Sequence, residues 1–384
     1  MKDGDFKMKM LIFSPQSTLS STLTGRTLKL MKGIKINNEL KIYCLHGDSN
    51  KNLTEISDGF NINYFGSMLV KKTKNNKEYY SFIKVIWLFF LATLKESQLL
   101  FKNLDYDNIY FVKNQPMHIM PALICKIFKK KVILDIDDLE YKSNKKFCKI
   151  LGILDKILPS ISNKIFVCSP YLLNVYSKYK DVTYLPTPLE EIKIKKKNNE
   201  EKCIIYFGSV SIHSGHRVDL LLESMQELYK KGINIKTYIL GDGADLVNLQ
   251  KKYSNLIDKG IICFLGRYNK KILSKFLEKN CIIIDPIDDT LQNKAKSSSR
   301  LLIAAYTIKP YITFRIKDSI QDYYLSKNFP GFIEKNNVKS LSKKILFFTK
   351  NSQKINFKEY YPFIREFYKK EVQDKFRREM YELK

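Results

Sequence analysis

A cluster of hydroxyl and basic side chains in the last third of the chain suits the binding of an anion. Ser297, Ser298 and Ser299 are preceded by Lys296, followed by Arg300, and stand directly before an apolar run of helical composition. The first turn of a helix here would present hydroxyl groups, unpaired backbone N–H groups and two cations together. We predict that these five residues bind phosphate oxygens; an ordinary helix cap beside solvated cations is the alternative.

Three other loops carry glycine or arginine where an apolar, strand-like run ends. Gly208 ends CIIYFG and Gly241 ends KTYILG, while Arg217 and Arg267 stand in loops that follow such runs. Glycine lets the backbone approach a ligand closely, and arginine can donate two parallel hydrogen bonds to a phosphate. Because ligands of open parallel sheets bind at the carboxyl ends of the strands, we predict that these four residues contribute to anion binding. Ordinary strand-to-helix connections would show the same residue types.

A polar loop follows the first apolar run of the chain. This segment, QSTLSSTLTGR, contains Ser17, Thr18, Gly25 and Arg26. Its hydroxyl groups and its glycine make it suited to a polar ligand.

Three carboxylates follow the strand-like run KVIL in the first half. They belong to Asp135, Asp137 and Asp138. Carboxylates at a strand end can orient or deprotonate a hydroxyl group, or hold a divalent cation. The acidic first turn of a helix would place the same residues there without any chemistry.

The elements that must position these residues are short β-like runs alternating with longer helical patterns. This alternation predicts an α/β fold with parallel sheets built from βαβ units. A charged segment without apolar periodicity, residues 191–202, divides the pattern into two similar halves. We expect one domain over residues 1–190, a second over residues 203–350, and a helical tail over residues 351–384.

The cysteines and histidines indicate neither a disulfide framework nor a metal site. The seven cysteines are scattered without a C-x-x-C pair, and only four histidines are present. Free thiols in a reducing compartment explain this pattern, so we expect a cytoplasmic protein without a metal ion.

The formal charge of +28 indicates an anionic partner. Nucleotide phosphates, a lipid diphosphate and an acidic membrane face all fit, whereas the spread of lysines along the chain lacks the stripe typical of nucleic-acid binding. The run VIWLFFLATL, residues 85–94, is about half of a membrane span and has lysines on both sides. It predicts either a buried helix or a helix on the inner face of the membrane.

Taken in order, the motifs resemble those of the family 4 glycosyltransferases, which have the GT-B fold. The order is YFGS before GHRVDLLLESM, then ILGDGADL, then FLGRYNKKIL through CIIIDPID, then KSSSRLLIAAYTIKPYIT. The resemblance implies two Rossmann-like domains that face a cleft, with a C-terminal helix crossing back to the first domain. It also implies sugar transfer from a nucleotide-sugar to a glycan or lipid-linked acceptor, without a cofactor and with retention at the anomeric carbon, in bacterial surface-polysaccharide biosynthesis.

The resemblance also assigns roles by position. Gly208 and Arg217 would face the diphosphate, Arg267 the nucleotide, and the segment 297–300 the phosphates or the sugar. The first domain, including the loop after its first strand, would bind the acceptor. Asp137 falls where the family often has a histidine or an acid beside the acceptor, and it would be the catalytic residue.

The sequence departs from the family pattern at two places, which leaves alternatives open. Leu302, Ile303 and Ala304 stand where the family usually has a glutamate. The arginine–lysine pair that is usual in the first loop is incomplete, since Ser209 follows Gly208 and His216 and Arg217 come later. A non-catalytic homologue that binds a nucleotide-sugar or a glycan is therefore one alternative. A metal-dependent GT-A transferase that uses Asp135 and Asp137 as a D-x-D motif is another.

Overall fold

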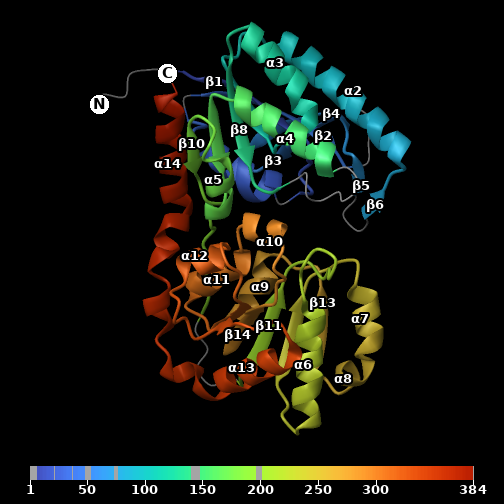
Figure 1. Ribbon diagram of the computed structural model, residues 1–384, viewed down its shortest axis with the longest axis vertical. Coiled ribbons are helices and arrows are strands. Elements are labelled where there is room, and N and C mark those ends of the chain that lie inside the picture. The colour runs from blue at the N-terminus through green and yellow to red at the C-terminus, as the bar shows by residue number, and fades with distance from the viewer. Residues whose placement is uncertain are drawn as a thin grey trace. The chain divides into compact units, whose positions relative to one another are not determined.

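The chain divides into two compact units, each with its own parallel sheet (Figure 1). The computed structural model describes residues 7–20, 22–36, 38–47, 53–72, 77–139, 148–195 and 201–383, so part of the charged segment between the halves lies outside the described residues. The first unit comprises Met1–Pro188, Ala295–Ser297 and Glu366–Lys384. The second comprises Leu189–Lys294 and Ser298–Arg365.

The sheet of the first unit has eight strands among the described residues, in the order β10-β9-β8-β7-β1-β2-β4-β3. Their bounds are β1 Lys9–Ser14, β2 Glu39–His46, β3 Leu53–Ser57, β4 Phe60–Ser67, β7 Asn108–Val112, β8 Lys131–Ile136, β9 Lys164–Val167 and β10 Val182–Tyr184. All neighbouring strands pair in parallel except β3, which runs antiparallel to β4 at the edge. The central strands are continuous apolar runs, as expected for a parallel sheet that is covered on both faces.

Helices cover both faces of this sheet. One face packs under α2 (Phe82–Phe101), α3 (Ile119–Ile127), α4 (Cys148–Ile161) and α5 (Pro170–Tyr176). The other face packs under the turn Leu23–Thr27, α1 (Leu28–Lys32) and the last helix, α14 (Lys369–Glu382). A small hairpin of β5 (Val70–Lys72) and β6 (Lys77–Tyr79) precedes α2. In the described ranges, no helix combines the length and the apolar composition that a membrane crossing requires.

The sheet of the second unit is entirely parallel, in the order β13-β12-β11-β14-β15-β16. Its strands are β11 Cys203–Phe207, β12 Lys236–Leu240, β13 Ile262–Gly266, β14 Cys281–Asp285, β15 Tyr311–Phe314 and β16 Phe332–Ile333. Its helices are α6 Val218–Lys230, α7 Leu246–Lys252, α8 Ser254–Asp258, α9 Lys270–Leu277, α10 Leu291–Ala295, α11 Ser299–Thr307, α12 Ile320–Tyr324 and α13 Val338–Asn351. The predicted α/β class with two Rossmann-like sheets is confirmed.

The last helix, α14, returns to the first unit and completes its core. Phe376 is fully buried, and its ring lies 6.2 Å from the ring of Tyr110 and 5.4 Å from that of Phe166. The Nε of Arg377 donates to the carbonyl of Gly33 at 2.8 Å. The tail predicted from residue 351 begins with short 3₁₀ turns after α13, and its long helix starts only at Lys369.

Candidate functional site

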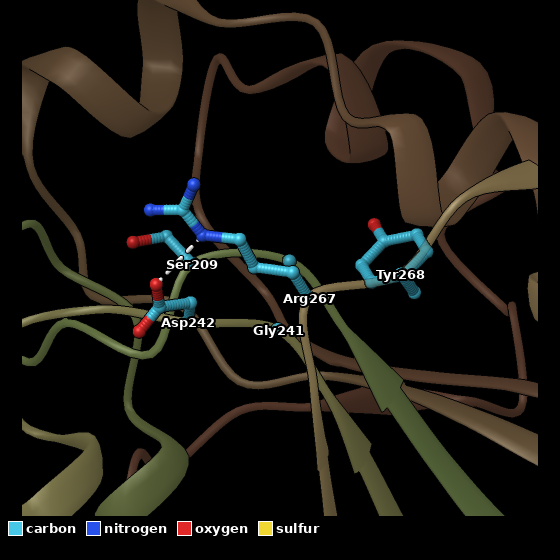
Figure 2. Close-up of a pocket in the computed structure, with 6 residues that line it drawn as sticks. Ser209, Gly241, Asp242, Arg267 and Tyr268 are labelled. Carbon is cyan, nitrogen blue, oxygen red and sulfur yellow. Dashed lines mark hydrogen bonds and ion pairs between the residues drawn. The ribbon is translucent and has the colours of Figure 1, made fainter. Parts of the chain in front are cut away.

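A pocket of about 260 Å³ lies at the carboxyl ends of β11, β12 and β13 in the second unit (Figure 2). It is lined by Gly208, Ser209, Gly241, Asp242, Arg267 and Tyr268. Three predicted site residues, Gly208, Gly241 and Arg267, are therefore brought together there. The other three lining residues come from the same loops.

Glycine is required in these loops because their backbones touch one another. Gly241 has a φ of +155°, and a Cβ there would lie 1.8 Å from the carbonyl oxygen of Gly208. Gly208 has a φ of +138°, and a Cβ there would lie 2.4 Å from Nη1 of Arg300. Backbone hydrogen bonds from Gly208 N to Leu240 O (2.9 Å) and from Gly241 N to Gly266 O (2.8 Å) fix the contact. The glycines thus form a tightly closed floor for the pocket.

Arg267 is the cation that the pocket presents to solvent. Its side chain is 55% exposed, and its Nε donates to Oδ2 of Asp242 at 2.8 Å. Within the described part of the chain, its two terminal nitrogens have no hydrogen-bond or ion-pair partner. Figure 2 shows the guanidinium above Asp242 and beside Ser209. On the other side of the pocket stands Tyr268, whose pKa is raised by burial.

Arg217 is held by two carboxylates and does not line this pocket. Its Nη2 lies 2.8 Å from Asp219, and its Nη1 lies 3.1 Å from Asp288. These bonds, first of all the one to Asp219, raise the pKa of the guanidinium. Arg217 therefore ties the start of α6 to the loop after β14, and its predicted contact with a diphosphate remains a prediction.

Arg300 is buried in the second unit and spans two strand ends. Its Nε lies 2.5 Å from Oδ1 of Asp285 at the end of β14, and its Nη1 donates to the carbonyl of Phe207 at 2.7 Å. Its Nη2 lies 3.1 Å from Nδ1 of His216. All three guanidinium nitrogens are thus engaged inside the protein. Burial alone would raise the pKa of Asp285, but Arg300 and the neighbouring hydroxyl groups lower it.

The serine run begins a helix, as predicted, and its hydroxyl groups have different surroundings. Ser298 is the N-cap of α11, because its Oγ accepts from Leu301 N at 3.2 Å while donating to Asp285 at 2.8 Å. Ser299 is exposed. The Oγ of Ser297 is buried and has no hydrogen-bond partner among the described residues. Lys296 lies 3.9 Å from Asp138. The helix-cap alternative therefore applies to Ser298.

In the first unit, Asp137 lies at the end of β8 and is held in its charged form. Burial alone would raise its pKa, but Lys113 and then Thr22 lower it. The Nζ of Lys113 lies 3.1 Å from Oδ1 of Asp137, and the hydroxyl of Thr22 donates to Oδ2 at 2.7 Å. Lys113 itself has a φ of +71°, a left-handed backbone that costs an L-residue about 1–2 kcal/mol. The ion pair with Asp137 is thus made by a lysine whose backbone conformation is mildly unfavourable.

Arg26 lies deeper than the predicted polar loop suggested. It is 2% exposed, and its Nη2 lies 2.7 Å from Oδ1 of Asp135. Its Nη1 donates to the carbonyl of Leu185 at 2.8 Å. Gly25 lies beside it in the π-helical turn Leu23–Thr27.

The two other residues predicted for the acceptor loop are already hydrogen bonded. The hydroxyl of Thr18 lies 3.0 Å from Tyr64 Oη and 3.1 Å from Glu55 Oε2. Ser17 is buried, and its Oγ accepts from Leu19 N at 3.3 Å. The acceptor roles of Ser17, Thr18, Gly25 and Arg26 stay predictions.

The carboxylates of the D-x-D motif each face a cation of the protein. Asp135 pairs with Arg26, and Asp137 pairs with Lys113. In the ranges that the structure describes, no group of three or more His, Cys, Asp or Glu side chains is arranged to hold a metal ion.

Several residues at these sites were not predicted from the sequence. Ser209 and Tyr268 each stand next to a predicted residue at a strand end, so the strand-end rule could have included them. Lys113 follows β7 directly, so the same rule could have predicted it as a site residue. Asp285 ends β14, but nothing in its sequence context shows that Arg300 pairs with it.

This chain is similar to known proteins in its structure and not detectably in its sequence. No family model matches the sequence, and no curated protein does so either. The lipopolysaccharide outer core galactosyltransferase WaaB is 12% identical with a TM-score of 0.64, covering 98% of this chain and 99% of its own. Sucrose-phosphate synthase from Thermosynechococcus elongatus is 12% identical with a TM-score of 0.68, covering 98% of both chains. Anabaena HepE, solved in complex with UDP-glucose, is 11% identical with a TM-score of 0.66, covering 98% of this chain and 100% of its own.

The chain has the GT-B fold. The predicted fold is confirmed, including the last helix that returns to the first unit. The GT-A alternative is wrong, since two separate Rossmann-like sheets make up this GT-B chain.

Proposed function

We propose that this GT-B protein is a glycosyltransferase that moves a sugar from a nucleotide-sugar to a glycan or lipid-linked acceptor. The pocket at the ends of β11, β12 and β13 carries the proposal. There Arg267 offers two guanidinium nitrogens that no described residue uses, above a floor closed by Gly208 and Gly241. That HepE, which has a similar fold, was solved with UDP-glucose supports a nucleotide-sugar as the donor.

Stabilisation of the leaving group is the chemistry that Arg267 would supply. When the sugar leaves its nucleotide, negative charge builds up on the diphosphate. A fixed cation near that charge stabilises the transition state more than the ground state, and removing one such donor typically costs about 3 kcal/mol, or roughly 100-fold in rate. This mechanism needs no metal ion, so we expect transfer in the presence of a chelator. We keep retention at the anomeric carbon as an expectation from the family resemblance.

In the first unit, Asp137 is the residue that we assign to the acceptor. Lys113 and Thr22 lower its pKa, so it is charged at neutral pH and is a weak general base. Its role would be to accept a hydrogen bond from the acceptor hydroxyl and to orient it. WaaB is by name a lipopolysaccharide galactosyltransferase, and its similar fold supports a surface glycan as the acceptor class.

A nucleotide-sugar-binding protein without catalytic activity is the second candidate. Arg217 and Arg300 are both engaged by carboxylates of the protein itself, which favours this candidate. It is also favoured because Leu302, Ile303 and Ala304 stand where the family usually has a glutamate. Such a protein would bind the donor in the same pocket but would not cleave it.

The test is a calorimetric screen of the full chain against UDP, GDP, ADP, CMP and their common sugar conjugates, in chelator and in Mn²⁺. Glycosyl transfer predicts that one nucleotide-sugar binds in chelator and is then slowly hydrolysed or transferred. A ligand at 100 times its dissociation constant adds about 2.7 kcal/mol to the free energy of unfolding, so the melting point is a second readout. Binding without turnover would support the second candidate. Absence of binding to every nucleotide would contradict both.

A further inference from the structure

Two neighbouring helices of the first unit expose an unusual number of large apolar side chains. On α2, Ile83 is 80% exposed and Trp87 is 58% exposed, and on α3, Ile127 is 75% exposed. We call the full set the α2–α3 apolar face; it consists of Phe82, Ile83, Ile86, Trp87, Phe90, Phe101, Met120, Leu123, Ile127 and Phe128. An exposed apolar surface of this kind on a folded domain marks a place of interaction.

The exposed side chains follow the helical repeat. On α2 they recur at 82/83, 86/87 and 90, and on α3 at 120, 123 and 127, so each set lies along one side of its helix. Leu88 and Ala92, on the opposite side of α2, are buried, and Ala92 belongs to the core of the first unit. Core packing therefore explains one side of α2 and leaves the other side unexplained.

The two stripes form one surface. α2 and α3 lie side by side in Figure 1, and both contribute to the same core. At their carboxyl-terminal ends the ring of Phe101 lies 5.8 Å from that of Phe128, edge to face. Both rings are about half exposed, so this contact extends the apolar surface from one helix to the other.

The exposed charges carried by α2, by α3 and by the two residues after each helix are all positive. Lys84 lies among the apolar residues of α2, and Lys102, Lys126 and Lys129 are exposed near its far end. Glu96 is the one carboxylate in the sequence of the two helices, and it is fully buried against His118. An apolar helix side with tryptophan and phenylalanine, bordered by lysines and lacking exposed carboxylates, has the composition of a helix that lies in the interface of an anionic bilayer.

The positive border also argues against a second copy of the chain as the occupant. In a symmetric dimer through this face, the lysines of one copy would come close to those of the other, and like charges oppose such a contact. An anionic lipid surface meets both requirements at once. It accepts the apolar side chains, and it attracts each lysine near the surface.

We propose that the α2–α3 apolar face docks on an anionic lipid bilayer, with the side chains of α2 inserted to the depth of the headgroups. The helices lie parallel to the membrane, and the lysines contact lipid phosphates. This inference rests on the surface of the first unit alone and is independent of the proposed sugar transfer. If the transfer is also correct, the acceptor would be presented at the membrane.

Trp87 makes the proposal directly measurable, since it is the single tryptophan of the chain. The full chain is mixed at low salt with vesicles of phosphatidylcholine alone or enriched in phosphatidylglycerol. We expect co-sedimentation and a blue shift of the tryptophan emission with the anionic vesicles, reversed by high salt. Lipids with a quencher near the headgroup should quench the emission more than lipids with a quencher at the chain end.

Two variants and a matched control separate the contributions. Ile83→Ser/Ile86→Ser keeps Trp87 and should weaken vesicle binding by about tenfold or more, because two exposed apolar side chains are lost from the face. Lys84→Glu/Lys102→Glu should weaken binding to anionic vesicles by at least about tenfold. Val247→Ser/Tyr323→Ser removes side chains that are 72% and 66% exposed in the second unit and should bind like the wild type.

Three results would overturn the proposal. The first is neither sedimentation nor an emission shift with anionic vesicles at low salt. The second is equal binding to neutral vesicles, which would remove the role of the lysines. The third is a dimer in sedimentation velocity without lipid that Ile83→Ser/Ile86→Ser dissociates, which would assign the face to a second copy. Unchanged melting points of all variants would exclude unfolding as the cause of lost binding.

Discussion

Nε of Arg300 lies 2.5 Å from Oδ1 of Asp285, and both side chains are buried. The pair connects the start of α11 to the end of β14, and through the carbonyl of Phe207 it also reaches the end of β11. Ser298, Tyr311 and Gln321 donate to the second oxygen of the same carboxylate. Arg300, which we predicted from the sequence to bind phosphate, thus holds the ends of β11 and β14 and the start of α11 together.

Replacement of Arg300 should therefore lower the free energy of unfolding. Arg300→Met leaves Asp285 as a buried, unpaired charge, and such a loss typically costs about 3–5 kcal/mol. Urea unfolding followed by circular dichroism measures the change. Arg300→Met/Asp285→Asn should recover part of the loss. A change below about 1 kcal/mol in Arg300→Met would show that the pair contributes little to stability.

Arg267→Ala should weaken nucleotide binding while leaving the free energy of unfolding almost unchanged. Its side chain is mostly exposed and its ion pair with Asp242 is a surface pair, so the free energy of unfolding should change by less than about 1 kcal/mol. Binding of the donor nucleotide should weaken by about tenfold or more, since a charge-assisted contact with a phosphate is lost. Calorimetry on this variant and on Lys252→Ala, an exposed lysine elsewhere in the second unit, makes the comparison. Equal nucleotide affinities of the two variants would mean that Arg267 does not contact the diphosphate.

Gly241→Ala should damage both the fold and the pocket. The new Cβ would lie 1.8 Å from the carbonyl oxygen of Gly208, which forces the two loops apart. Gly232→Ala is the matched control, because its φ is +73° and no heavy atom lies within 4 Å of its Cβ position. We expect a loss of about 1 kcal/mol for the control and about 3 kcal/mol or more for Gly241→Ala. Thermal unfolding that ranks the two variants equally would contradict the close contact.

Truncation of Phe376 should destabilise the first unit although it lies near the end of the chain. Its ring is fully buried between Tyr110 and Phe166, and a buried phenylalanine truncated to alanine typically costs about 3–5 kcal/mol. Arg378→Ala on the exposed side of α14 should change stability by less than about 0.5 kcal/mol. Chemical denaturation of both variants tests this, and similar midpoints would mean that α14 does not contribute to the core.

The carboxylate of Asp137 should make the free energy of unfolding depend on pH in the acidic range. Its folded pKa lies below its unfolded value of about 3.9, so its contribution is fully present above that value and is lost as the pH falls through the folded pKa. The free energy of unfolding of the wild type should therefore decline more steeply below about pH 4 than that of Asp137→Asn. At neutral pH the variant should be less stable, and the two curves should approach each other in acid. Parallel curves would mean that Lys113 and Thr22 do not stabilise the charged form.

Much of the fold could be predicted from the sequence because its signals are local. The runs CIIYF, KTYIL and CIIID are apolar, short and separated by helical patterns, and they became β11, β12 and β14. The edge strand β3 was missed, since LTEIS is exposed along nearly its whole length and carries no apolar run. The two-residue strand β16 is too short to leave any pattern.

From the sequence alone, the loops of Gly208, Gly241 and Arg267 could be placed at the carboxyl ends of strands, where ligands of open parallel sheets bind. Which arginine remains available at the pocket depends on contacts that form only in the folded chain. Arg217 and Arg267 stand in similar loops, but Asp288, 71 positions further along the chain, reaches Arg217 and not Arg267. Whether a cation is buried in an ion pair or presented to a ligand depends on carboxylates that folding brings close. A single sequence records the residues of such a pair but not the distance between them.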